Sequence, residues 1–149
     1  MRSILVDWLI DVSQEFELES NTIHLAVNYT DRFLSLNRVN RDRLQLCGVT
    51  ALLIASKYNE KQPPCVNDFV YITDYTYTRE QVLFMESTML NTLQFSMCAV
   101  TQDDYTDYFL QKCISSAVSR DQTQYAYIHN LVHYISELTL HEYSCLKYS

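Results

Sequence analysis

One stretch of the sequence, LQLCGVTALLIASKYNE from Leu44 to Glu60, constrains the fold more than any other. A helix that is apolar all round is surrounded by other elements rather than lying on a surface. The run ends at Lys57, a charge that is costly to leave unpaired beside a core. The sequence therefore predicts a central helix with a charged end that needs a partner. Its apolar positions cover every side of that helix: Leu46, Cys47, Val49, Ala51, Leu52, Leu53, Ile54 and Ala55.

Apolar residues at helical spacing predict four further helices around this one. The adjacent Pro63 and Pro64 end the central helix, because a residue before proline is pushed out of the helical region. Small residues such as Gly48 let neighbouring helices approach it closely. The sequence thus predicts a compact five-helix bundle. Its other helices span Met1 to about Phe16, a segment capped by Ser20 or Asn21, a short piece around Val66 to Ile72, and Arg79 to about Leu93 capped by Thr78.

The last fifty residues have a different texture and predict a second unit. Acidic residues and tyrosines mark one helix that ends near Lys112, and a further helix runs from Gln122 to Leu140. These elements are too few to bury a core of their own. We therefore expect an all-α protein in which residues 1–99 form one domain and residues 100–149 form the first helices of a second bundle.

Composition excludes several classes of function. The net charge of −7 argues against nucleic acid, whose phosphates are bound through lysine and arginine. The single glycine, Gly48, excludes phosphate-cradling loops, which need several. Charges near the start argue against a signal peptide, and no window reaches the ~20 apolar residues of a membrane span. We expect a soluble, intracellular protein with no cofactor.

Five scattered cysteines, odd in number, argue against a disulfide framework and against a zinc site. We expect reduced thiols that are mostly buried. His129 and His133 lie four residues apart on a predicted helix, as metal ligands do. No third ligand is evident beyond Glu137, so we expect no metal site there.

Several segments together resemble a known family. They are MRSILVDWLIDV, HLAVNYTDRFLS, LQLCGVTALLIASKY, DFVYITDYTYT and the pair Met85-Glu86. This pattern is similar to that of the cyclins, specifically the mitotic A/B type, from Met1 to about Phe95. The final third is weaker, although ISELTLHEYSCLKYS resembles the place where the third helix of a second cyclin box begins. The resemblance implies a five-helix cyclin box followed by a truncated second box.

The resemblance also implies a function in the cell cycle, at cell division and mitosis. Cyclins of this type are not enzymes. They bind and activate a cyclin-dependent Ser/Thr protein kinase, hold its C-helix in the active position and recruit substrates. The implied partners are that kinase and proteins with a basic-x-leucine docking motif, and neither nucleic acid nor a membrane is implied. The implied location is the nucleus and the cytoplasm.

Lys57 and Glu86 match family positions at the kinase-facing surface. The residues themselves agree, because a charge at the end of a buried helix and one on the inward side of another are tolerated only when paired. The alternative is an internal ion pair without any partner protein, with the apolar neighbours as ordinary core; for Leu90 the two interpretations are equal. The implied apolar contacts are Ile54, Tyr58, Leu90, Phe95 and Met97.

A second set of residues matches the substrate-docking groove of A-type cyclins. In such a groove an aromatic side chain would contact the leucine of the docking motif. Asp11 would attract the basic residue of the motif, and Gln45 would hydrogen-bond with its backbone amides. The alternative is that Trp8 is core. Arg2 and Asp31 match positions that pair and tie the first helix to the second, and we interpret them as structural. The implied groove residues are Met1, Ile4, Leu5, Trp8, Asp11, Leu44 and Gln45.

The sequence departs from the family pattern at residues 59–62. Asn59, Glu60, Lys61 and Gln62 stand where relatives have two acidic residues, an apolar residue and a tyrosine, on a loop implied to face the kinase. This departure leaves the choice of kinase open. Two alternatives remain: a cyclin-box protein of another class, such as a transcription factor that holds DNA, and a non-activating pseudo-cyclin.

Overall fold

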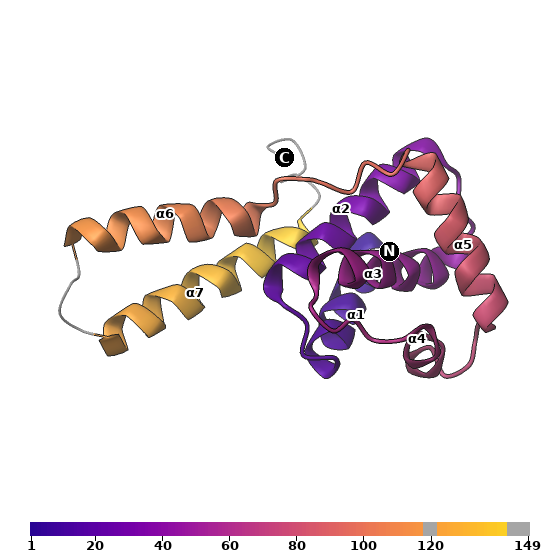
Figure 1. Cartoon of the computed structure of the whole chain (residues 1–149), viewed down its shortest axis with the longest axis horizontal. Helices are drawn as coiled ribbons and strands as arrows, with labels where there is room; N and C mark the ends of the chain where they lie inside the picture. Colours follow the sequence, from indigo (N-terminus) through magenta and orange to yellow (C-terminus); the bar gives the residue numbers. More distant parts are fainter. Residues whose placement is uncertain (118–121, 143–149) are drawn as a thin grey trace. The chain divides into compact units, whose positions relative to one another are not determined.

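The computed structural model describes residues 1–117 and 122–142, except for the side chains of residues 113–117 and 122–125. Every regular element in these ranges is helical, which confirms the all-α prediction (Figure 1). None of these helices is both long enough and apolar enough to cross a bilayer. The elements are α1 (Arg2–Glu15), α2 (Ser20–Leu36), the 3-10 turn η1 (Arg41–Arg43), α3 (Leu44–Asn59), α4 (Val66–Ile72), α5 (Arg79–Thr92), α6 (Gln102–Ala117) and α7 (Gln122–His141).

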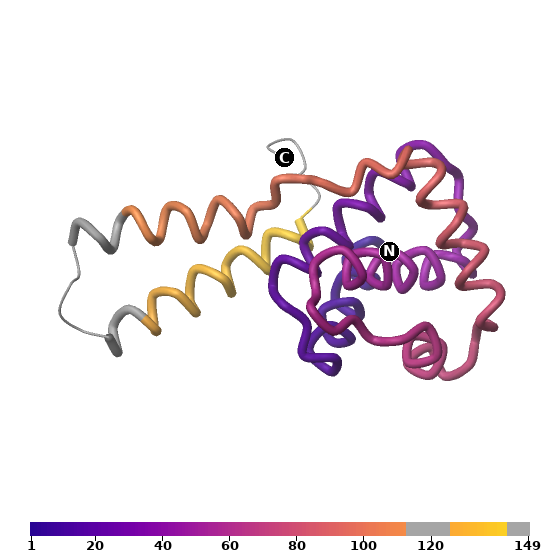
Figure 2. Tube along the Cα trace, in the orientation of Figure 1, coloured from indigo at the N-terminus to yellow at the C-terminus, as the bar shows by residue number. Residues whose placement is uncertain are grey.

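The chain divides into two compact units, Met1–Ala99 with α1 to α5 and Val100–Ser149 with α6 and α7. Figure 2 traces both units along the backbone. That the second unit is a partial second cyclin box stays a prediction, and residues 143–149 of the stretch ISELTLHEYSCLKYS lie outside the described part.

The first unit is organised around α3. All eleven residues from Leu46 to Ser56 are buried, so the helix is enclosed on every side as its sequence predicts. Figure 1 shows α3 in the middle of this unit, and it packs against α1, α2, α4 and α5. The burial of α3 therefore fixes where its neighbours lie.

Gly48 sets how closely α1 can approach α3. A Cβ atom at this position would lie 2.9 Å from Cδ1 of Leu5 and 3.2 Å from Cδ1 of Leu9. Real Cβ atoms almost never come as close as the first distance, so a larger side chain must displace the methyl groups of Leu5 and Leu9. Both leucines are buried and also line a pocket between α1 and α2, so these methyl groups take up part of the strain before the helices move apart.

We predict that Gly48→Val lowers the free energy of unfolding by about 1–3 kcal/mol, because overpacking a filled core forces side chains and backbone to shift. Urea denaturation followed by circular dichroism measures it. The control is Thr50→Val in the same helix. Thr50 is fully buried and its hydroxyl has no hydrogen-bond partner, so removing it should be neutral or stabilising. Equal stability of Gly48→Val and the parent chain would contradict the prediction.

The start of α2 is held from the far end of α3. The helix begins at Ser20 with Glu19 as N-cap, and Glu19 makes no side-chain capping bond, so the prediction of a cap at Ser20 or Asn21 is wrong. Instead Oε1 of Glu60 accepts hydrogen bonds from the Glu19 N–H, at 2.8 Å, and from the Thr22 hydroxyl. A carboxylate from a distant residue thus takes over a role that local residues usually fill.

We predict that Glu60→Ala lowers the free energy of unfolding by about 1–2 kcal/mol, as the loss of a helix-capping group does. Gln62→Ala, an exposed position two residues on, is the matched control and should stay within about 0.5 kcal/mol of the parent. Urea denaturation of both variants tests this, and an equal effect of the two would argue against the capping role.

Two shorter-range predictions are confirmed. The short helix α4 spans Val66–Ile72 as expected. Thr78 caps α5: its hydroxyl accepts the Gln81 N–H, and Gln81 Oε1 accepts the Thr78 N–H at 2.8 Å. This reciprocal arrangement is a capping box.

Three helices of the first unit end in left-handed backbone without glycine. Glu17, Asp74, Tyr75, Gln94 and Phe95 have φ between 51° and 55°. The single glycine is inside α3, so none is present at these ends. Backbone bonds hold the strained residues, for example the N–H of Phe95 to the carbonyl of Leu90 at 2.9 Å. Each such residue costs about 1–2 kcal/mol relative to a right-handed one.

In the second unit, α6 and α7 run side by side in opposite directions (Figure 1). Thr101 caps the start of α6. Its N–H donates to Asp104 Oδ2 at 2.8 Å, and the Asp104 N–H donates to the Thr101 hydroxyl at 3.3 Å. The hydroxyl of Thr139 on α7 donates to Gln102 Oε1 at 2.6 Å. Large apolar side chains remain exposed, as expected of two helices that cannot enclose a core: Tyr105, Tyr108, Phe109, Tyr127, Leu131, Tyr134, Ile135 and Leu138.

Candidate protein-binding surface

Lys57 and Glu86 form an ion pair at the edge of the first unit. Lys57 lies in the last turn of α3 and Glu86 in the middle of α5, and the two helices pack together. Nζ of Lys57 donates to Oε1 of Glu86 at 2.6 Å. The side chain of Lys57 is 43% exposed and that of Glu86 is 14% exposed. The structure therefore brings these two predicted residues together, with the lysine on an open face.

The electrostatics of the pair favour its position. The C-terminus of a helix carries partial negative charge, which favours a cation in its last turn. Glu86 is largely buried, so removing Lys57 would leave a carboxylate without its cation. Among the described residues, Glu86 is the hydrogen-bond partner of Lys57, and an ammonium group has three donors. The two remaining donors are available to acceptors outside the chain.

The five predicted apolar contacts divide into surface and core. Tyr58 and Phe95 are exposed, by 53% and 65%, and Leu90 is half-buried. Ile54 and Met97 are only 4% and 8% exposed. Both therefore lie in the core of this chain, which agrees with the alternative interpretation of them as ordinary core, and their contact with a kinase stays a prediction.

The segment that carries Phe95 is fixed to α2. The hydroxyl of Tyr29 donates to the carbonyl of Met97 at 2.6 Å, and Arg32 Nη1 donates to the carbonyl of Ser96 at 2.9 Å. Burial, more than any nearby charge, raises the pKa of Tyr29 to about 12, so this hydroxyl remains a donor at neutral pH. The ring of Phe95 is thus presented on a rigid backbone.

Cys98 affects the titration of Tyr58. Its side chain hydrogen-bonds with Cys98, and this bond is the main cause of a raised pKa of Tyr58. The phenol therefore keeps its proton at neutral pH. Tyr58 follows Lys57 directly, so the cation and the aromatic ring belong to the same turn of α3.

One exposed aromatic residue was missed by the sequence analysis. Phe84 on α5 is 74% exposed. It lies out of phase with the inward stripe of Val82, Met85 and Met89, all buried. Its phase on the helix was the signal that could have identified it as a surface residue.

The segment that departs from the family pattern is only partly a surface. Asn59 donates to the Thr22 hydroxyl at 2.9 Å, and Glu60 holds the start of α2 as described above. Lys61 and Gln62 are exposed. The expectation that the four residues together face a partner is therefore corrected: the first two are committed to internal bonds. Beside Lys57 a hollow of about 270 Å³ is lined by Pro63, Pro64, Cys65, Val66, Asn67 and Arg79.

The predicted docking groove lies along α1. A pocket of about 210 Å³ there is lined by Met1, Leu5 and Leu44, together with residues of α2 such as Val27 and Leu34. The other predicted groove residues do not line it. Ile4 and Asp11 are exposed, and Trp8 and Gln45 are half-buried. Three of the seven predicted residues therefore share one apolar hollow.

Arg2 and Asp31 close the rim of this pocket. Nε of Arg2 donates to Oδ1 of Asp31 and Nη2 donates to Oδ2, both at 2.8 Å. The side chains are 17% and 19% exposed. Such a bidentate pair fixes geometry as well as charge, so it ties α1 to α2.

The cysteines differ from the expectation of mostly buried thiols. Cys47 is buried, and this burial raises its pKa to about 12, which keeps it an unreactive thiol. Cys65 and Cys98 are exposed, so the expectation is wrong for two of the three cysteines with described side chains. The side chain of Cys113 and all of Cys145 lie outside the described part.

Comparison with known families gives a direct match to the first unit. Residues 1–98 match the family described as the N-terminal domain of cyclins. The chain belongs to the cyclin family. Cyclins are regulatory proteins rather than enzymes, so the expectation that the chain is not an enzyme is confirmed.

Curated relatives of this cyclin are A-type cyclins of plants. Cyclin-A3-1 of Oryza sativa subsp. japonica is 47% identical over 147 residues, Cyclin-A1-3 of the same organism 46% over 148, and Cyclin-A2-1 of Arabidopsis thaliana 45% over 148. Each alignment covers 99% of this chain but only 38%, 29% and 32% of the respective relative. The expected resemblance to the A/B type is therefore confirmed, and the chain spans about a third of the length of these relatives.

A solved structure has the same fold. The viral cyclin from herpesvirus saimiri matches with a TM-score of 0.82, covering 97% of this cyclin and 61% of the viral chain, at 23% sequence identity. The cyclin-box fold is therefore confirmed for the described part of the chain.

Proposed function

We propose that this cyclin binds and activates a cyclin-dependent Ser/Thr protein kinase as a regulatory subunit in control of the cell cycle. The observation that carries the proposal is the ion pair of Lys57 and Glu86, which stands at an open edge of the bundle with spare hydrogen-bond donors on the lysine. An internal brace needs no such exposure. We expect the protein to act in the nucleus and cytoplasm.

The mechanism is a shift of population in the kinase. A kinase is active when a lysine–glutamate ion pair that includes its C-helix is in place to position the ATP phosphates. A partner that contacts only this helix-in state stabilises it by differential binding. Shifting a 1:99 mixture to 99:1 takes about 5.5 kcal/mol, which a few well-packed anchors can supply.

The surface residues of this chain fit that task. Lys57 can donate to main-chain carbonyls at the end of the C-helix, while its bond to Glu86 holds the ammonium group in place. Tyr58 and Phe95 offer exposed aromatic area, the type of side chain that dominates interface energetics. The hydrogen bonds that hold the backbone beside Phe95 limit the entropy lost on binding.

Reversing the two charges distinguishes a contact with a partner protein from an ion pair that only stabilises the fold. In the double variant Lys57→Glu with Glu86→Lys an ion pair can still form, so we expect stability close to that of the parent chain. We predict that kinase activation falls at least tenfold, the effect of losing about 1.4 kcal/mol of differential binding. Activity towards a short generic peptide, measured at saturating ATP with the purified kinase, tests this.

The matched control is Arg38→Ala, which removes an exposed cation in the segment between α2 and η1. It should activate the kinase as the parent chain does. The variant Lys57→Ala with Glu86→Ala should abolish activation while its helical circular dichroism is retained. Full activation by either double variant would rule out the proposed role.

We also propose that the surface along α1 recruits substrates that carry a basic residue followed by a leucine. The pocket lined by Met1, Leu5 and Leu44 is apolar and of a size for a leucine side chain. Asp11 is exposed further along the same helix and can attract the basic residue. Trp8 lies on α1 between these two parts.

We predict that Trp8→Ala weakens phosphorylation of substrates with the docking motif and spares a short generic peptide, because only the former need the groove. Asp11→Asn changes an exposed residue without removing volume, so it tests the same surface at little risk to the fold. Tyr71→Ala, at an exposed aromatic residue of α4, is the control. Equal loss on both substrates would argue against the groove.

Two other functions are separated by simple assays. A cyclin-box protein that holds DNA should bind it with an affinity that falls steeply with salt, and the net charge of −7 opposes this. A pseudo-cyclin should co-purify with a kinase without activating it.

A further inference from the structure

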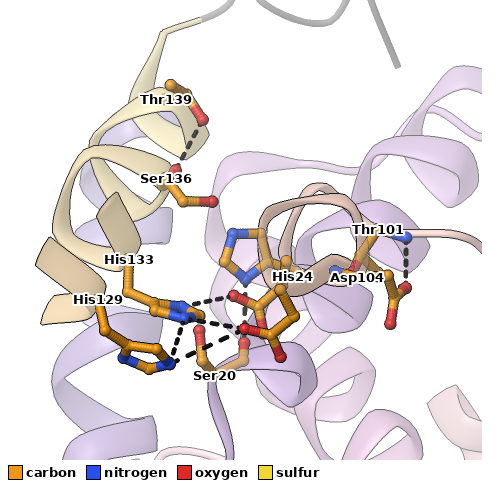
Figure 3. A network of polar contacts seen from close by, with 10 residues as sticks. Ser20, His24, Thr101, Asp104, His129, His133, Ser136 and Thr139 are labelled. Carbon is orange, nitrogen blue, oxygen red and sulfur yellow. Dashed lines mark hydrogen bonds and ion pairs between the residues drawn. The ribbon is translucent and has the colours of Figure 1, made fainter. Parts of the chain in front are cut away.

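The facing sides of α6 and α7 bring two histidines and two aspartates together. Figure 3 shows His129 and His133 one turn apart on α7, joined by dashed lines to the neighbouring groups. Nε2 of His133 lies 3.2 Å from Nε2 of His129 and 3.2 Å from Oδ1 of Asp107. Nε2 of His129 lies 3.9 Å from the same oxygen. Three donor atoms of metal-ligating type thus form a small triangle.

We propose that this triangle is a binding site for a divalent transition metal, with Zn²⁺ as its ion. A tetrahedral Zn²⁺ with bonds of about 2.1 Å keeps its donor atoms roughly 3.4 Å apart. The three distances above lie on either side of that value, as the donor atoms of a distorted tetrahedral site do. Two imidazoles and one carboxylate are a donor set that zinc accepts, with water in the fourth position.

Asp103 supplies an independent observation that points to a metal ligand. Its Oδ1 lies 2.9 Å from Nδ1 of His133, and its side chain is 7% exposed. An ionised carboxylate can only accept a hydrogen bond, so Nδ1 of His133 is the donor. This bond fixes the ring and directs Nε2 at the triangle, as the carboxylate partners of zinc-bound histidines do. Asp103 is a positioning residue and not a ligand.

The same bond explains why a cation belongs in the triangle. With its hydrogen on Nδ1, a neutral His133 has a lone pair on Nε2. This lone pair faces the carboxylate oxygen of Asp107 and the Nε2 atom of His129. A hydrogen on Nε2 of His129 or of His133 can bridge one of these contacts, because either imidazole can donate from that atom. A proton on Nε2 can serve one contact at a time, whereas a metal ion serves all three atoms.

The site was not visible in the sequence because its third ligand was sought on α7. Glu137 is not part of the cluster; the carboxylate comes from Asp107 on α6, 22 residues before His129. The expectation of no metal site rested on that missing ligand. A metal here would join α6 to α7 in a unit with many exposed apolar side chains. Such a unit gains little stability from a core, and the metal would add to it.

Zinc titration of the full 149-residue chain tests the proposal. All measurements use a chain with Cys65→Ser, Cys98→Ser, Cys113→Ser and Cys145→Ser, because cysteines also bind zinc, while Cys47 is kept because it is buried in α3. Competition against a chromophoric chelator then gives affinity and stoichiometry. We predict one Zn²⁺ per chain and a melting temperature that rises with zinc. His129→Ala, His133→Ala and Asp107→Asn should each lower the affinity at least tenfold.

Matched controls exist on the same helix. His141→Ala removes a histidine of α7 outside the cluster, and Glu137→Gln removes the acidic group that spacing alone suggested. Both should bind zinc as the parent chain does. Asp103→Asn should keep the stoichiometry and weaken binding by roughly 10–100-fold, the usual effect of losing such a supporting bond.

Two results would overturn the proposal. One is a folded, helical chain with the four serine substitutions that binds no stoichiometric zinc, which would mean that the histidines share protons only. The other is binding that survives in the variant with both His129→Ala and His133→Ala. Substituting Co²⁺ gives a further check, because a tetrahedral nitrogen and oxygen site produces visible absorption that the double variant should lack.

Discussion

The enclosure of α3 is the constraint from which the rest of the first unit takes its arrangement. From Leu46 to Ser56 no side of this helix can face water, so four helices must cover it, and a particular residue specifies how several of them meet it. α1 closes in where Gly48 leaves room. α2 starts where Glu60, just past the end of α3, holds it. α5 meets the last turn of α3 at Lys57. The apolar part of α3 thus sets the distances to the neighbouring helices, and its polar end sets their orientations.

The two ion pairs of this unit illustrate different uses of charge. In the pair of Arg2 and Asp31 both carboxylate oxygens are engaged and both side chains are similarly shielded, which suits a fixed joint between helices. In the pair of Lys57 and Glu86 the shielding is unequal, because the carboxylate is covered while the ammonium group is half-exposed. An asymmetric pair holds a cation in place at a surface, as the proposed contact with a kinase requires.

How much could be predicted from the sequence depended on the range of the interactions involved. The enclosed helix, the bounds of α4 and the cap at Thr78 follow from residues within one or two turns, and the sequence identified them. Glu60 and Thr22 are 38 residues apart, and no local pattern links them. The same holds for Asp107 and the histidines of α7.

The predicted surface shows the same limit. The cyclin resemblance implied the pairing of Lys57 with Glu86. The residues agreed with it, because a charge at the end of an enclosed helix and one on the inward side of another need a partner. The periodicity could not tell whether Ile54 and Met97 reach the outside, since that depends on which neighbours cover them. Family resemblance named the residues of a surface, but only packing decides which of them a partner could touch.

The left-handed helix ends have a consequence for evolution and engineering of this protein. At Asp74-Tyr75 and at Gln94-Phe95 an aromatic residue occupies backbone that glycine would adopt with less strain. In the second case the ring projects onto the proposed binding face. Glycine at Gln94 would ease the backbone by roughly 1 kcal/mol and leave that ring in place. The stability of this protein can therefore be raised at Gln94 without altering the proposed binding face.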